Sequence, residues 1–323
     1  MKNKNLEKKL EIGFWALIAA TWLFSFYAIP HSALGPNGFF GSFFENHTFL
    51  KLAAVFVLMA HLTIAAMSIN FHRGHTHQAI KLNKFVDYAM QTWLWAISSM
   101  SKLDWVSVHI YHHAHSDQAE DPHSPKQKGL LHVFFFGVLD FTEAKSWPAV
   151  KKIRDRLPAS TYEKFIANHL FLAPIILASS LFFLFGPKYG SILSVLNFAI
   201  TPLFAVGGVN ALAHAFGYQN YDSKDESRNL GFLLPLNWII SGELDHNNHH
   251  RYPKSPSFAH RWFEFDIGFV YVRALKVLGL ARITGNIPDY HSVAHTKTVA
   301  SSVGSAVDAA SEHLSIQPLQ LAE

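Results

Sequence analysis

Four long apolar stretches limit the folds open to this chain more than any other feature. They occupy residues 13–30, 50–70, 165–186 and 191–212, and each approaches the roughly 20 residues that a helix needs to cross a bilayer. Only 15% of the 323 residues are charged, whereas soluble chains usually carry about 25%. The sequence therefore predicts an all-α integral membrane protein with four transmembrane helices.

The connections between the apolar stretches add detail to this prediction. Only "PKYG" (187–190) separates the third stretch from the fourth, so the two are expected to form an antiparallel hairpin. A fifth apolar run, 85–103, is interrupted by Asp87, Gln91 and Lys102, and is predicted to be a buried or interfacial helix. The first stretch is too long for a cleavable signal peptide and lacks a small-residue cleavage site.

The distribution of Lys and Arg orients the predicted helices. Four lysines precede the first apolar stretch and "KKIRDR" (151–156) precedes the third, but the loop 31–49 carries no Lys or Arg. The positive-inside rule then predicts that both termini and the segment between the second and third stretches lie in the cytoplasm, which means the inner membrane if the protein is bacterial. Residues 1–296 are predicted to form one domain, and 297–323, rich in Ala and Ser, a weakly ordered tail.

Histidine is the residue type that points to chemistry. The chain has 21 histidines and no cysteine, so imidazole and carboxylate are its available metal ligands. The pattern HxxHH occurs twice, at 109–113 and at 246–250. Positions i, i+3 and i+4 share one face of a helix, so each triad can bind one or two metal ions. The predicted topology brings both triads, His72 and His214 to the cytoplasmic face, which indicates a shared site.

A third histidine group is ambiguous by spacing alone. The segment "NFHRGHTHQAI" offers His72, His75 and His77. His72 and His77 are roughly 140° apart around an ideal helix, so they can share a metal only if the helix ends or distorts there. On a straight helix His72 and His75 are the better pair. The spacing leaves this choice open.

The number of histidines indicates two metal ions. A catalytic zinc takes only three protein ligands, fewer than the two triads supply, and iron would add oxidative power. Histidine ligands usually donate their second N–H to an acceptor. The acceptors expected here are the neighbouring carboxylates Asp104, Asp117, Asp121 and Asp245.

Several motifs, in order from about residue 50 to residue 281, resemble those of membrane fatty-acid desaturases of the acyl-CoA Δ9 (stearoyl-CoA) type. The three histidine motifs are "HRGHTH", "DWVSVHIYHHAHSDQAEDPHS" and "GELDHNNHHRYP". Two further matching segments are "NALAHAFGYQNYD" and "RWFEFDIGFVYVRALKVLGLA". The resemblance implies an O2-dependent desaturase that inserts a cis Δ9 double bond into a saturated acyl chain. It also implies a cytoplasmic helical cap that holds two irons, with O2 as co-substrate.

The resemblance also assigns roles to individual residues. The iron ligands carried over by motif are His72, His77, His109, His112, His113, His214, His246, His249 and His250. Asn210 is expected to act through a water and, being four residues before His214, to share a helical face with it. Trp105 matches a tryptophan beside the bend of the substrate tunnel. Outside this set, His75, His115 and His123 are expected around the site or on the surface, and His31, His47, His61 and His169 are expected to be structural.

The partners follow from the same resemblance. Ser107 and Val108 stand where animal members carry an Arg–Asp pair that contacts CoA. CoA is still the expected acyl carrier, with a lipid or acyl carrier protein as alternatives. Because the chain has no haem-binding or ferredoxin segment, electrons are expected from a separate protein of the ferredoxin or cytochrome b5 type. Membrane lipids are the other expected partners, and no basic block is dense enough to predict nucleic-acid binding.

Two other functions compete with desaturation. A lipid or alkane hydroxylase would use the same histidine-rich di-iron architecture, and it differs in adding an oxygen instead of removing two hydrogens. A membrane metal transporter would place histidines inside the spans along a path. The candidate histidines here gather at one end of the predicted spans, which argues against transport.

Overall fold

The computed structural model describes residues 38–290. The chain divides into two compact units, Met1–Asn286 and Ile287–Glu323, and every element named below belongs to the first. The first predicted span, 13–30, and the predicted tail, 297–323, lie outside the described residues.

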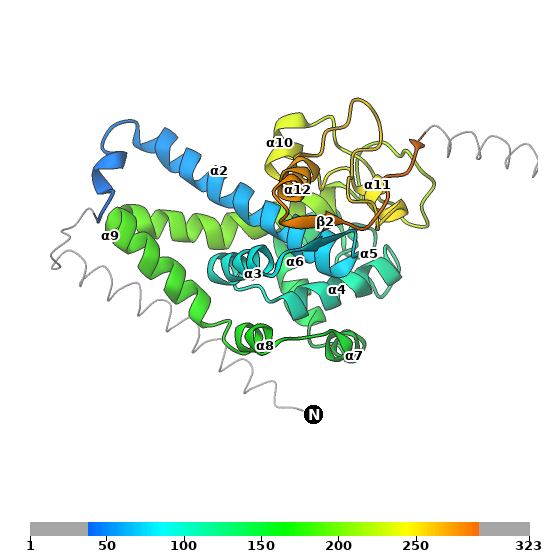
Figure 1. Cartoon of the computed structure of the whole chain (residues 1–323), viewed down its shortest axis with the longest axis horizontal. Coiled ribbons are helices and arrows are strands. Elements are labelled where there is room, and N and C mark those ends of the chain that lie inside the picture. The colour runs from blue at the N-terminus through cyan, green and yellow to red at the C-terminus, as the bar shows by residue number, and fades with distance from the viewer. Residues whose placement is uncertain (1–37, 291–323) are drawn as a thin grey trace, which may run out of the picture. The chain divides into compact units, whose positions relative to one another are not determined.

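The first unit is built mainly of helices (Figure 1). In chain order the helical elements are η1 (Gly41–Phe44), α2 (Thr48–Ala66), η2 (Met67–Thr76), α3 (Lys84–Ser98), α4 (Lys102–His115), α5 (Pro125–Lys128), α6 (Leu130–Ala144), α7 (Pro148–Arg156), α8 (Thr161–Asn168), α9 (Leu172–Pro202), η3 (Leu203–Leu212), α10 (Leu234–Ile239), α11 (His246–Arg251) and α12 (Ile267–Val277). Of these, η1 is a 3₁₀-helix, and η2 and η3 are π-helices. Strands β1 (Ile80–Leu82) and β2 (Ala281–Ile283) pair antiparallel, with Lys81 opposite Arg282.

Two helical segments in the described part of the chain are long and apolar enough to cross a membrane. They are Thr48–Thr76, which joins α2 to η2, and Leu172–Phe198 within α9. The first contains the whole predicted span 50–70. The second starts later than the predicted 165, because the backbone leaves helical geometry at His169, between α8 and α9.

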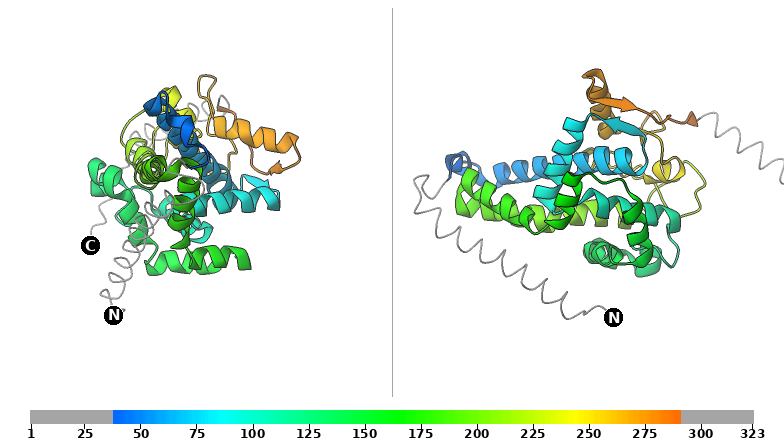
Figure 2. Two further views of the ribbon diagram at one scale, coloured as in Figure 1. Left: turned by 90° about the vertical axis from the view of Figure 1, so that its left-hand side faces the viewer. Right: turned by 60° about the horizontal axis from the view of Figure 1, so that its bottom comes forward.

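The predicted hairpin turns inside α9. Gly186 has φ 72° and ψ 171°, a conformation open almost only to glycine, and the two arms of α9 diverge from this point (Figure 1). The backbone N–H groups of Phe39 and Phe40 donate to the carbonyls of Phe183 and Leu184, so the chain before α2 closes over the turn. The second arm continues through η3. Figure 2 shows α2 lying alongside α9, with α4 and α11 at one end.

The predicted helix 85–103 is in fact two helices. The Asn83 side chain caps α3 by accepting from the Phe85 N–H, and Ser99 ends that helix in the left-handed conformation. A new helix, α4, then begins after Ser101, whose side chain accepts from the Asp104 N–H. Serine and asparagine favour these ends because their side chains satisfy backbone donors that the helix leaves free.

An apolar core lies beneath the second half of α2. Ile64 and Phe71 pack there with Leu94 of α3, Val106 of α4 and Val209 of η3. Because these elements come from distant parts of the sequence, their shared core fixes the relative positions of the histidine-bearing segments.

Candidate active site

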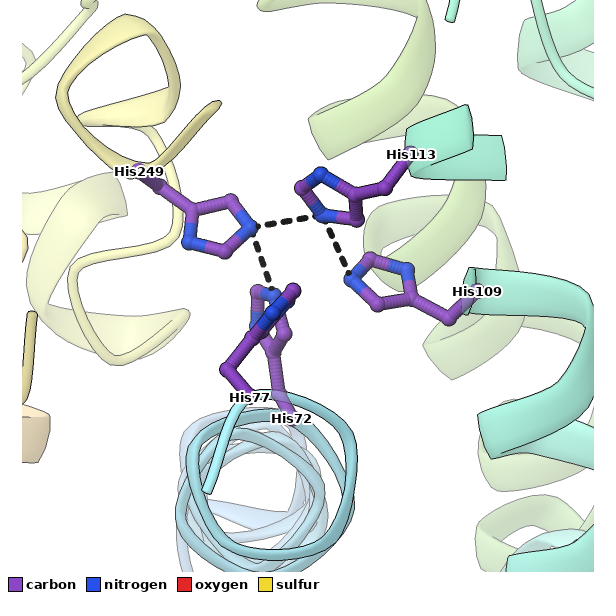
Figure 3. Close-up of side chains that lie close together, drawn as sticks. All are labelled: His72, His77, His109, His113 and His249. Atoms are coloured by element: carbon purple, nitrogen blue, oxygen red, sulfur yellow. Dashed lines mark hydrogen bonds between the residues drawn. The ribbon is translucent and has the colours of Figure 1, made fainter. Parts of the chain in front are cut away.

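Nine buried or half-buried histidines gather in two groups. The first group contains His72, His77, His109, His113 and His249, and the second contains His112, His214, His246 and His250. Within each group, one ring nitrogen of every residue lies within 4.8 Å of the others. Figure 3 shows the rings of the first group pointing toward one another from η2, α4 and α11. These nine residues are the ones that the sequence singled out.

The π-helix η2 explains how His72 and His77 meet. The His77 N–H donates to the carbonyl of His72, five residues earlier, at 3.1 Å, which is the π-helical bonding pattern. Residues five apart lie on the same side of such a helix, and the two ring centroids are 5.1 Å apart. His75 points elsewhere, with its Nε2 2.9 Å from the Asp87 carboxylate. The helix is therefore distorted in the way that His72 and His77 need in order to share a site.

The two HxxHH segments divide their histidines in the same way. On α4, His109 and His113 belong to the first group, while His112 faces the second. On α11, His246 and His250 belong to the second group and His249 faces the first. In each segment the i and i+4 residues stay together, and the i+3 residue reaches across. Both helices therefore contribute to both groups.

Buried or half-buried carboxylates fix the ring orientation of four of these histidines. The Nδ1 atom of His72 lies 2.8 Å from Glu243, and that of His112 lies 2.9 Å from Asp121. In the second group, His214 pairs with Asp117 at 2.8 Å and His250 with Asp225 at 2.7 Å. An ionised carboxylate only accepts hydrogen bonds, so each Nδ1–H donates to its carboxylate and each Nε2 is the atom left to face its group.

The free nitrogens fit a bound cation. The Nε2 atoms of His77, His112, His214 and His250 are buried and have no hydrogen-bond partner among the described residues. In the first group, the Nε2 of His249 lies 2.9 Å from the Nε2 atoms of both His72 and His113. Buried polar atoms are normally satisfied, and imidazole lone pairs converging in this way are satisfied by a metal ion that prefers nitrogen donors.

The protonation states agree with this use. Burial, followed by the charges of neighbouring histidines, holds the pKa of His77, His109, His113, His246 and His249 well below the usual value. Burial also lowers the pKa of His250, to about 4, although Asp225 opposes the shift. Imidazole binds metals in its neutral form, so these side chains are ready as ligands at neutral pH.

The carboxylates beside the histidines were partly predicted. Asp117 and Asp121 are acceptors, as expected. The other two expectations were wrong: Asp104 accepts from Arg154 Nε at 2.8 Å, and Asp245 accepts from the Asn237 amide at 3.1 Å. Glu243 and Asp225 take their places, and neither was predicted. Glu243 lies three residues before His246, but Asp225 is brought in from a loop with no signal in its local sequence.

A cavity of about 1330 Å³ opens onto the first histidine group. His72, His109, Asn210 and Trp105 line it together with apolar side chains that include Ile64, Met67, Met100, Leu139 and Val209. The indole of Trp105 stacks on the His109 ring, with centroids 4.5 Å apart. Asn210 lies in the π-helix η3 and His214 lies beyond the end of that helix, so the expected α-helical face does not relate them.

The border of this cavity at α7 and the end of α6 is charged. Lys145, Lys151 and Arg154 line it there, together with Glu143. Ser107 is fully buried, and its hydroxyl donates to the Asp104 carbonyl.

Several other histidines in the described part of the chain bond or pack within the protein. His61 Nδ1 donates to the Ile239 carbonyl at 2.8 Å, which leaves Nε2 to accept from the Tyr271 hydroxyl. His115 and His169 bond to backbone carbonyls one turn earlier in the chain. His123 is buried beside His112, and burial lowers its pKa to about 3. His47 is the N-cap residue of α2, and His31 lies outside the described residues.

Comparisons with known proteins agree with this geometry. The family model for fatty acid desaturases matches residues 47–266. Delta-9 acyl-lipid desaturase 1 of Arabidopsis thaliana is 30% identical over 225 residues, which cover 67% of this chain and 69% of that protein. Delta-9 acyl-lipid desaturase 2 of the same plant is 27% identical over 255 residues, covering 75% of this chain and 80% of the relative.

A third relative carries a different name. The acyl-CoA C20 Delta5-desaturase of Anemone leveillei is 29% identical over 236 residues, covering 70% of this chain and 71% of its own length. The family match spans more than half of this chain and includes all nine clustered histidines. Together these findings identify an oxidoreductase, and the chain belongs to the fatty acid desaturase family.

Proposed function

We propose that this protein is a multi-pass membrane desaturase that inserts a cis Δ9 double bond into a saturated acyl chain. Four transmembrane helices would carry a cytoplasmic helical cap, with both termini in the cytoplasm. The observation that carries the proposal is that His72, which Glu243 orients, and His109, whose pKa burial lowers, border a largely apolar cavity of about 1330 Å³. Two of the relatives are named Delta-9 desaturases, which supports this position for the double bond.

The nine histidines are the proposed ligands of two irons, with Asn210 acting through a water. A bound pair of irons would supply the redox chemistry that breaks unactivated C–H bonds, which no acid or base in the protein can do. Each turnover removes two hydrogens from the acyl chain, takes up two electrons and two protons, and reduces O2 to two waters. The electrons are proposed to come from a separate ferredoxin or cytochrome b5 type protein.

The residues around the cavity hold the substrate. Its apolar walls would exclude water and hold the acyl chain at a fixed depth beside His72 and His109. This depth would determine which two methylenes of the chain react. Trp105, stacked on His109, forms part of the wall next to the histidines. At the charged border of the cavity, Lys145, Lys151 and Arg154 outnumber the carboxylates Glu143 and Asp104, which suits the phosphates of a CoA thioester, and we propose CoA as the carrier. The relatives are named for both acyl-CoA and acyl-lipid substrates.

Product analysis tests the reaction directly. Expressed in a desaturase-deficient strain, the protein should yield monounsaturated chains two mass units lighter than the saturated substrate, with the double bond at carbon 9. A gain of one oxygen would instead mean hydroxylation.

A matched pair of histidine variants tests the ligand set. His249→Ala removes a nitrogen at the centre of the first group and should abolish both product and iron binding. His75→Ala removes an imidazole of the first histidine motif that lies outside both groups and bonds to Asp87, and it should retain iron. Full activity in His249→Ala would refute the ligand assignment.

A further inference from the structure

An apolar patch covers α10 and the loop before α12. Its exposed side chains are Phe232, Leu233, Leu234, Trp238, Trp262 and Phe265. Ring contacts join its members in two sets. Trp238 lies 5.5 Å from Phe265, while Tyr218 lies beside Phe232 and Phe263, and Phe263 lies 5.7 Å from Trp262; the chain segment 232–238 connects the two sets. Trp262 is 94% exposed. Contiguous exposed aromatic surface on this scale marks a surface that meets a partner or a membrane.

The patch lies next to the part of α2 around His61. His61 of α2 donates to the carbonyl of Ile239, the last residue of α10. The exposed apolar face of α2, which includes Phe49 and Leu58, ends at Leu62, and residues 63–73 are all buried. The patch therefore begins where the exposed face of α2 stops.

The exposed apolar face of α2 is too short to span the hydrocarbon core of a bilayer. From Thr48 to Leu62 the helix rises only about 22 Å, whereas the hydrocarbon core of a bilayer is about 30 Å thick. Exposed Phe39, Phe40 and Phe43 precede α2 and mark the far boundary. With these side chains taken as the far boundary, the missing length of roughly 8 Å falls at the histidine end, at the level of α10.

Helix α3 marks the same boundary independently. Trp93 Nε1 donates to Thr63 Oγ1 of α2, and Trp95 Nε1 donates to the carbonyl of His169, just before α9. Thus α3 links the points where both apolar helices meet the rest of the unit, and exposed Phe165 and Phe171 lie beside the second point. Tryptophan and other aromatic side chains concentrate at membrane–water interfaces because their rings are apolar with a polar edge.

We propose that the patch inserts into the phospholipid leaflet on the histidine side of the bilayer, at the boundary between acyl chains and headgroups. This inference rests on the membrane placement in the proposed function. The insertion bears on the site because α10 also carries Asn237. The Asn237 side chain accepts from the Leu244 N–H and donates to Asp245, the residue before His246. Lipid contact on one side of α10 thus holds the segment that leads into α11.

The cysteine-free chain allows a direct test with single-cysteine variants. We would introduce Trp262→Cys, Phe265→Cys and Phe232→Cys separately, attach a nitroxide label, and reconstitute the full chain in phosphatidylcholine vesicles. Collision rates of each label with O2, which dissolves in lipid, and with a water-soluble nickel chelate report depth. Leu58→Cys serves as the lipid reference and Lys126→Cys, on an exposed ion pair, as the aqueous reference.

The expected result is an O2-to-nickel collision ratio for the three patch labels that lies between the ratios of Leu58→Cys and Lys126→Cys and well above the latter. A ratio equal to the aqueous reference would overturn the inference. So would protection from both reagents, or spin–spin broadening between copies, because either means that protein covers the patch. If the Leu58→Cys label itself is water-accessible, the membrane placement in the proposed function fails as well, which separates the two failures. Trp262 is almost fully exposed, so its replacement leaves the packing intact.

Discussion

His72 illustrates how a neighbouring carboxylate orients an imidazole so that its second nitrogen is free to bind a metal. Its Nδ1 donates to Glu243, which in turn accepts from Ser68 and faces the buried guanidinium of Arg73 at 3.8 Å. Although burial raises the pKa of Glu243, its pairing with His72, followed by Arg73 and the hydrogen bond from Ser68, holds this pKa below the usual value. The carboxylate stays ionised, so it selects the tautomer in which Nε2 points toward the first group.

Replacing Glu243 by Gln should weaken metal binding without removing a ligand. An amide oxygen accepts a hydrogen bond more weakly and carries no charge. The His72 ring would therefore be less firmly oriented, and its Nε2 would be a weaker metal ligand. Loss of such a partner typically lowers metal affinity by about 10- to 100-fold. Chelator competition with ferrous iron measures the affinity. Glu226→Gln, which breaks the exposed ion pair with Lys126, is the control and should leave the affinity unchanged. Equal affinities in the two variants would contradict this role for Glu243.

At the level of elements, some features were predictable from the sequence and others were not. Hydropathy predicts the second span and a turn between two apolar arms, because apolar runs of about 20 residues and a short link leave few alternatives; the turn lies at Gly186, one residue before the predicted link 187–190. The two HxxHH patterns predict that their histidines act together, because this spacing places them on one face of a helix. The π-helices η2 and η3 were not predicted, since a shift from i+4 to i+5 bonding leaves no clear pattern in a single sequence. Partners such as Asp225 depend on loop paths that only the folded chain defines.

The turn inside α9 predicts a large effect from a small substitution. Gly186→Ala would place a Cβ on a backbone at φ 72° and ψ 171°, a region that costs other residues about 1–3 kcal/mol. The midpoint of thermal unfolding in detergent should fall accordingly. Gly208→Ala is the matched control, because an added Cβ there meets no atom within 4 Å and the backbone needs no positive φ. Equal midpoints of thermal unfolding for the two variants would contradict this prediction.

At the scale of the whole molecule, the two histidine groups tie the stability of the protein to pH. Six of the nine imidazoles have a lowered pKa because burial penalises their charged form. His112 behaves in the opposite way, since Asp121 outweighs burial and raises its pKa. The unfolded chain would bind protons at all of these sites near pH 6.5. Unfolding without metal therefore takes up protons.

The metal-free protein should lose stability as the pH falls. Stability rises with pH wherever the unfolded state binds more protons, so the loss begins near pH 6.5 and continues toward the folded-state values, about 4 for His250. Its thermal midpoint should be clearly lower at pH 5 than at pH 7.5, and added metal should restore it at pH 5 in part. A midpoint that is unchanged or higher at pH 5 would show that the buried imidazoles are already protonated in the folded state.

The sharing of α4 and α11 between both histidine groups has a consequence for assembly of the centre. An ion in one group would align the i+3 histidine of each helix for the other group, so the first ion lowers the cost of ordering the second set of donors. Filling should then be cooperative, and a titration of metal-free protein should pass from empty to doubly loaded with little singly loaded species between.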